Sequence, residues 1–142
     1  MILVDTNVLL DLVGDDADWA EWSLEQLQAT ALEDALVINS VIYAELSVRY
    51  QAIEALDSFV EGVGLEISEI PRAGLFLAGK AFSAHRSAGG ARTSVSPDFF
   101  IGAHAAILGI PILTRDVKRY RTYFSAVELI SPADSGDYGS AS

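Results

Sequence analysis

The sequence has 142 residues and contains no cysteine. This absence excludes disulfide bonds, thiolate catalysis, iron–sulfur clusters and cysteine-based zinc sites, and it is typical of a reducing compartment. The chain also lacks a long uncharged run: the longest, residues 99–114, has 16 residues, whereas a membrane-spanning helix needs roughly 20. The first residues carry no basic segment of the kind that begins a secretory signal. We therefore expect a cytoplasmic protein with no membrane segment.

Positive charge is scarce and unevenly distributed. Twenty acidic residues against nine lysines and arginines give a net charge of −11. Residues 1–48 contain ten acidic residues and no lysine or arginine, whereas residues 72–121 contain eight basic residues and only two acidic ones. The net charge argues against nucleic-acid binding, which depends on phosphate contacts. The basic segment nevertheless allows an anionic substrate in one place, and the acidic segment a basic partner in another.

Short apolar runs alternate with longer amphipathic segments along the whole chain. The short runs predict five strands, at residues 2–4, 36–38, 65–70, 110–113 and 127–130. The amphipathic segments predict helices from residue 6 onward and over 17–33, 41–60 (one or two helices), 72–88 and 96–109. This alternation predicts a three-layer α/β fold in which a parallel sheet is flanked by helices. We expect one domain over residues 1–132 and a flexible C-terminal tail over 133–142.

Four acidic residues from distant parts of the chain are expected to meet at one edge of this sheet. Asp5 directly follows the first strand, and Asp116 closely follows the fourth. Glu45 lies about one and a half turns into the helix after the second strand. Asp98 lies in the first turn of the helix before the fourth strand. Ligands of open parallel sheets bind beyond the carboxyl ends of the strands, where all four carboxylates are expected.

Carboxylates that converge repel one another unless a cation lies between them. The cations that prefer oxygen ligands are Mg²⁺ and Mn²⁺, and the chemistry that uses such a cluster is phosphoryl transfer. Each acid also has a simpler interpretation. Asp5 could cap the following helix, Asp98 could complement a helix dipole, Glu45 could be a solvated surface residue, and Asp116 could pair with a neighbouring base. Their combined position favours the metal site.

Four segments of the sequence resemble the four motifs of PIN-domain ribonucleases. They read ILVDTN at 2–7, SVIYAE at 40–45, SPDFFIGAHA at 96–105 and LTRD at 113–116. The resemblance extends to about Pro132 and is greatest to the VapC toxins of type II toxin–antitoxin pairs. It implies an endoribonuclease dependent on Mg²⁺ or Mn²⁺, an antitoxin partner and a homodimer.

The resemblance also implies roles for individual residues. Asp5, Glu45, Asp98 and Asp116 would be the catalytic metal ligands, with Asn7 and Thr114 as polar support. Within this set we expect Asp5 and Asp98 to be the primary ligands. Glu45 and Asp116 would complete the site through water or a second metal.

A group of basic residues follows the fourth acid and alternates with tyrosines at 120 and 123. Basic and aromatic side chains together suit single-stranded RNA, through phosphate contacts and base stacking. We therefore expect substrate contacts from Arg115, Lys118, Arg119 and Arg121. The alternative is that these residues form an ordinary solvated helix face.

Neither histidine is expected to be catalytic. His104 lies six positions after Asp98, about 240° around a helix, so the two side chains do not share a face. His85 lies near a predicted helix end, where the helix dipole favours a cation. Gly102 does share the face of Asp98, and it either lets another segment approach closely or is an ordinary packing glycine.

Other functions remain open from the sequence. A receiver-type phospho-acceptor domain would need an acidic pair after the first strand, where the chain has Asp5 alone. A haloacid-dehalogenase-like phosphatase would need Asp-x-Asp where the chain has Asp5-Thr6-Asn7. A non-catalytic protein-binding module would show no response to metal and no RNA cleavage.

Overall fold

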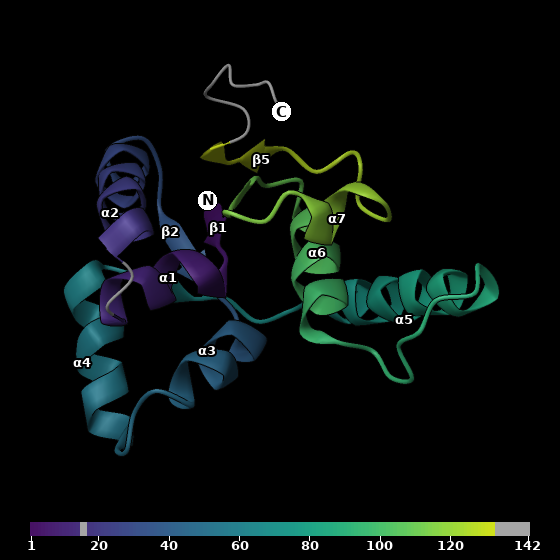
Figure 1. Ribbon diagram of the computed structural model, residues 1–142, viewed down its shortest axis with the longest axis horizontal. Coiled ribbons are helices and arrows are strands. Elements are labelled where there is room, and N and C mark those ends of the chain that lie inside the picture. The colour runs from purple at the N-terminus through teal and green to yellow at the C-terminus, as the bar shows by residue number, and fades with distance from the viewer. Residues whose placement is uncertain (15–16, 133–142) are drawn as a thin grey trace.

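The computed structural model describes residues 1–14 and 17–132, and the predicted tail at 133–142 lies outside these residues. A five-stranded sheet with the order β3-β2-β1-β4-β5 forms its centre, and every pair of neighbouring strands is parallel (Figure 1). The strands are β1 (Ile2–Val4), β2 (Leu36–Ile38), β3 (Glu66–Ile67), β4 (Ile112–Leu113) and β5 (Leu129–Ile130). The predicted parallel α/β fold is confirmed. Three of the strands are shorter than predicted, above all the exposed edge strand β3.

Helices connect the strands and cover the sheet. They are α1 (Thr6–Val13), α2 (Ala17–Ala31), α3 (Ser40–Ser47), α4 (Ile53–Val63), α5 (Arg72–Ser87), α6 (Pro97–Leu108) and α7 (Lys118–Arg121). In Figure 1, α1, α2 and α4 lie on one side of β1, α5 to α7 lie on the other, and α3 lies below β1. The predicted helical segment 41–60 is two helices, and the short helix α7 has no counterpart among the predicted elements. None of the helices in the described ranges has the length and apolar character that a bilayer crossing requires.

The two central strands place the first and fourth sequence motifs side by side. Strands β1 and β4 are apolar and buried along their whole length, as expected for parallel strands covered on both faces. Val4 pairs with Leu113, and the backbone N–H of Asp5 donates to the Leu113 carbonyl at 2.9 Å. The residues that follow the two strands, Asp5 and Thr114, therefore lie next to each other at the carboxyl edge of the sheet.

A buried hydrogen bond joins α3 to α6. The Asn39 side chain caps α3 by accepting from the Ile42 N–H at 2.9 Å, so its amide nitrogen is left to donate to His104 Nδ1 at 3.0 Å. His104 therefore carries its hydrogen on Nε2, which is buried without a hydrogen-bond partner among the described residues. Burial lowers the pKa of His104 below its ordinary value of 6.5. The neutral ring fixes α3 relative to α6, and these helices carry Glu45 and Asp98.

A close approach between α6 and the segment after α7 depends on Gly102. A Cβ atom added at Gly102 would lie 2.3 Å from the buried ring of Phe124. Non-bonded carbon atoms do not approach so closely without strain, so any side chain at residue 102 must push the Phe124 ring away. Of the two interpretations that the sequence leaves open for Gly102, the structure supports the close approach of another segment.

Gly102→Ala is expected to destabilise the protein by about 1–3 kcal/mol, the usual cost of overpacking a core. Gly79→Ala is the matched control, because Gly79 lies inside α5 with open space around its Cα. That change should stabilise the protein by about 0.5–1 kcal/mol through helix propensity. Thermal or urea unfolding measures both. Equal stability of Gly102→Ala and wild type would contradict the packing described.

The protein is expected to lose stability below about pH 6.5 because of His104. The folded-state pKa is lowered, so the unfolded chain binds the proton more readily. The stability that neutral His104 contributes is complete above its unfolded pKa and is lost as the pH falls toward the folded-state pKa. The melting temperature of the wild type should therefore fall more steeply than that of His104→Gln between pH 7.5 and 5.5, an interval of about one unit on each side of the ordinary histidine pKa. Parallel curves for the two proteins would show that His104 is not responsible.

Candidate active site

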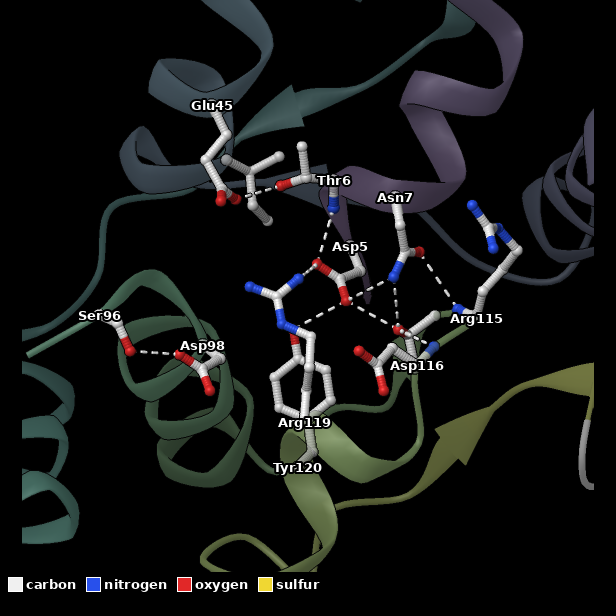
Figure 2. Close-up of polar contacts among 12 residues, drawn as sticks. Asp5, Thr6, Asn7, Glu45, Ser96, Asp98, Arg115, Asp116, Arg119 and Tyr120 are labelled. Carbon is white, nitrogen blue, oxygen red and sulfur yellow. Dashed lines mark hydrogen bonds and ion pairs between the residues drawn. The ribbon is translucent and has the colours of Figure 1, made fainter. Parts of the chain in front are cut away.

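Asp5 is the most strongly hydrogen-bonded carboxylate at the carboxyl edge of the sheet, and its side chain is fully buried. Its Oδ2 accepts from the hydroxyls of Thr114 at 2.7 Å and Tyr120 at 2.8 Å (Figure 2). Its Oδ1 accepts from the backbone N–H of Thr6 at 2.8 Å, which makes Asp5 the N-cap of α1. A buried carboxylate is stable only with such donors, so Asp5 organises three separate segments around itself.

The residues predicted as polar support do contact this carboxylate. Asn7 donates from Nδ2 to Asp5 Oδ2 at 3.4 Å and to Thr114 Oγ1 at 3.3 Å. Its Oδ1 accepts from the Arg115 backbone N–H at 3.2 Å. The Thr114 hydroxyl also accepts from the Asp116 backbone N–H at 3.0 Å. Asn7 and Thr114 thus hold the loop after β4 against the start of α1.

The other three acids approach the same edge from different elements. Glu45, on α3, is half-buried, and its Oε1 accepts from the Thr6 hydroxyl at 2.5 Å. Asp98, in the first turn of α6, is buried and accepts from Ser96 Oγ at 2.5 Å. Asp116 follows β4 and is exposed. The prediction that all four lie at this edge agrees with their positions in Figure 2.

The four carboxylates do not form a closed cluster. Within the residues that the structure describes, no three acidic or histidine side chains are close enough together to hold a metal ion. In Figure 2 the guanidinium of Arg119 occupies the space beside Asp5 that faces Glu45 and Asp98. Its Nη1 lies 3.3 Å from Asp5 Oδ1. The ligand type still fits a hard divalent cation, because Asp5, Glu45, Asp98 and Asp116 all offer carboxylate oxygens.

Arg119 carries its charge in this position. Burial is the largest single effect and acts to lower its pKa, but the charges of Asp5, Tyr120, Glu45 and Asp98 together outweigh burial, so that the pKa is raised. Its side chain is 22% exposed. The sequence predicts an RNA contact for Arg119, with a solvated helix face as the alternative. The structure places its guanidinium beside the Asp5 carboxylate.

Tyr120 has a different role from the one that its sequence position suggests. Its side chain is fully buried, so it is not available to stack on an RNA base. Burial and the charge of Asp5 raise the pKa of Tyr120 well above its ordinary value, and its hydroxyl stays protonated and donates to Asp5. Sequence reasoning missed this residue as a partner of Asp5. The alternation of tyrosines with basic residues gave no signal of which ring points inward.

Arg115 is also engaged elsewhere. Its Nε and Nη2 donate to the two carboxylate oxygens of Asp11 at 2.7 and 2.9 Å, and its guanidinium lies 4.8 Å from the ring centroid of Trp19. Asp11 is buried and also accepts from Ser23 Oγ at 2.6 Å. This bidentate pair fixes the loop after β4 to α1 and α2. The guanidinium of Arg115 is thus engaged with an acid of the same chain, and its RNA contact stays a prediction.

A groove of about 450 Å³ runs along the carboxylates. It is lined by the acids Asp98 and Asp116, the bases Arg92, Lys118 and Arg119, Thr122, and the aromatic rings of His85, Phe99 and Tyr123. The rings of His85 and Phe99 each lie 6.0 Å from that of Tyr123. Arg92 forms an ion pair with Asp98 at 3.3 Å. Of the predicted substrate residues, Lys118 is exposed in this groove and Arg121 is exposed but does not line it.

The strand order separates this fold from a receiver domain. Receiver domains have the flavodoxin-like order 2-1-3-4-5, in which the chain reverses between the first and third strands. Here β1 lies between β2 and β4, and β3 is at the sheet edge. The receiver alternative is therefore wrong.

Known structures share this fold. VapBC2 from Rickettsia felis bound to a DNA fragment from its promoter aligns with a TM-score of 0.70 and 20% identity, over 92% of this chain and 98% of that one. VapBC-1 from nontypeable Haemophilus influenzae aligns with a TM-score of 0.67 and 20% identity, over 92% of this chain and 98% of that one. FitAcB from Neisseria gonorrhoeae aligns with a TM-score of 0.64 and 21% identity, over 93% of this chain and 98% of that one. Curated protein sequences give no match.

The sequence itself matches a family description over most of its length. Residues 2–125 match the PIN domain, a range that contains all four predicted motifs and every residue of the site. The resemblance seen in the motifs is thereby confirmed at the level of the family. With a parallel sheet in the order β3-β2-β1-β4-β5 and acids gathered at its carboxyl edge, this chain belongs to the PIN domain family.

Proposed function

We propose that this protein is a metal-dependent endoribonuclease that acts as the toxin of a toxin–antitoxin pair. The observation that carries the proposal is the groove lined by Asp98 and Asp116 together with Arg92 and Lys118, in which the lining residue Arg119 also contacts buried Asp5. Acids next to bases and aromatic rings suit a phosphodiester that must be both bound and hydrolysed. Family membership supports a nuclease.

Asp5 and Asp98 would hold a divalent cation, Mg²⁺ or Mn²⁺, and Glu45 and Asp116 would complete the site. A cation so held supplies Lewis-acid activation of the phosphate and of the attacking water. Thr114 and Tyr120 hold the Asp5 carboxylate in a fixed position by donating hydrogen bonds to it. Ser96 orients Asp98 in the same way.

The chain's own side chains would bind the RNA along the groove. Lys118 is exposed beside Asp116 and is placed to contact a phosphate. The ring of Tyr123, with His85 next to it, offers a face for a nucleobase. Contacts of these kinds tolerate any sequence, because phosphates are uniform and every base has a π-face.

The antitoxin partner and the cytoplasmic location are parts of the same proposal. The solved relatives named above are VapBC and FitAcB proteins, and the present fold aligns with each over 98% of the relative's chain. A toxin that cleaves RNA must be held inactive by its partner in the compartment where RNA lies. The non-catalytic binding module, the remaining alternative, predicts no cleavage.

Asp98→Asn is expected to reduce RNA cleavage by about 10²-fold or more, because it removes an anionic ligand while keeping the shape of the side chain. Asp5→Asn should be as inactive but also less stable, since the five donors that now bond to the carboxylate would then face an amide with one acceptor oxygen. The assay is cleavage of a mixed RNA in Mg²⁺ and Mn²⁺, with melting measured alongside. Glu61→Gln, an exposed acid on α4, is the control and should keep full activity. Full activity of Asp98→Asn would falsify the site.

Lys118→Ala is expected to weaken cleavage of all RNAs by a similar factor, because phosphates carry no sequence information. The slope of the salt dependence should fall by roughly 0.7 for each single-strand phosphate that the protein no longer binds. Lys118 is substituted without Arg119, because Arg119 contacts Asp5 and a change at Arg119 would disturb the carboxylates. Lys80→Ala on α5, where the lysine lies over Phe76, is the matched control. A wild-type salt slope in Lys118→Ala would mean that this side chain is only solvated.

A homodimer is expected, with an interface on the helices within residues 17–60. These helices and their connections expose large apolar side chains at Leu24, Leu32, Val48 and Ile53. Ile53→Asp should therefore shift the protein toward monomer in sedimentation at tens of micromolar. Phe76→Asp on α5 should leave the dimer intact. A wild-type monomer under these conditions would contradict the prediction.

A further inference from the structure

Asp5 has one oxygen that its neighbours leave available for a cation. Its Oδ2 already accepts from Thr114 and Tyr120, and more weakly from Asn7. Its Oδ1 accepts from one backbone N–H, that of Thr6, and from the guanidinium of Arg119. Each carboxylate oxygen offers about two lone-pair positions, so a cation reaching Asp5 must approach Oδ1. The position that remains on Oδ1 is the one that Arg119 holds.

The ion pair between Arg119 and Asp5 is of a kind that a cation can replace. Its one hydrogen bond to Asp5 is 3.3 Å long, and its guanidinium also lies 5.7 Å from the ring centroid of Tyr120. The Arg115–Asp11 pair earlier in the same segment is bidentate, at 2.7 and 2.9 Å. Bidentate pairs with short distances are the strong ones. Arg119 also lines the groove, so its side chain can swing outward without unfolding α7. Tyr120 keeps α7 anchored to Asp5 when it does so.

The carboxylates also need a positive charge in the metal-free protein. Asp5 is fully buried and Asp98 is buried, and the charges of Asp5, Glu45 and Asp98 all act on the Arg119 guanidinium. Carboxylates this close repel one another when no cation lies between them. Arg119 supplies that cation from within the chain.

We propose that Arg119 is an internal counter-ion that holds the metal position of Asp5 in the metal-free protein, so that a divalent cation must displace it in order to bind. This inference rests on the proposed function, because it takes Asp5 to be a metal ligand. The guanidinium and the metal then compete for one oxygen. Each stabilises the carboxylates, and neither can do so while the other is in place.

The test is Mn²⁺ binding, measured by isothermal titration calorimetry on the full chain prepared in EDTA and then dialysed. Arg119→Gln removes the charge and keeps a polar side chain, and Arg119→Ala is the second variant. Both are expected to bind Mn²⁺ on the order of tenfold more tightly than wild type, a typical size for coupling between two ligands. Lys118→Ala is the matched control, since it removes a neighbouring charge without contacting Asp5, and it should tighten Mn²⁺ binding far less.

Thermal melting gives a second readout. In EDTA, Arg119→Gln should melt below wild type, because the carboxylates lose their counter-ion, and Mn²⁺ should raise its melting temperature more than it raises that of wild type. If wild type binds Mn²⁺ as tightly as both Arg119 variants do, the inference is wrong and the proposed function still stands. Absence of Mn²⁺ binding by wild type and both variants would overturn the two together. Binding by the variants alone would support the inference.

Discussion

The burial of the Asp5 carboxylate is the constraint on which the rest of this structure depends. An ionised carboxylate without solvent is costly unless donors surround it, and Asp5 is fully buried. One donor comes from the start of α1, and the others come from the end of β4 and from α7, 109 and 115 residues further along the chain. The interactions that stabilise one side chain therefore also position the loop after β4 and the helix that follows it. The site and the fold share one network.

The acids on helices, Glu45 on α3 and Asp98 on α6, are also held in place by contacts with other elements. Glu45 is linked to the network through Thr6, the residue next to Asp5. Asp98 lies on α6, which Asn39 and His104 join to α3, and Gly102 lets Phe124 close against α6. Glu45 and Asp98 thus each have their own structural support, through contacts that join α3 and α6 to other elements.

Sequence patterns predicted the arrangement of elements and the acids better than the roles of the bases. Strand ends in a parallel sheet lie at a known edge, so Asp5 and Asp116 could be placed from the order of apolar runs alone. Arg115 and Arg119 belong to one basic segment, yet one pairs with Asp11 and the other with Asp5. Composition cannot distinguish them, because the choice depends on which acid each side chain meets in three dimensions. The inward position of Tyr120 could not be predicted for the same reason.

On the proposed function, the pairing of these arginines would also explain how a chain with a net charge of −11 could offer a path for RNA. Much of the basic segment neutralises acids of its own fold: Arg115 pairs with Asp11, Arg119 with Asp5 and Arg92 with Asp98. The last two are single contacts at 3.3 Å, and both side chains line the groove. On the proposed function, one divalent cation bound by Asp5 and Asp98 would take over the neutralisation of both acids. Two guanidinium groups would then become available to phosphates, so metal and RNA would favour each other's binding through charges already present in the groove.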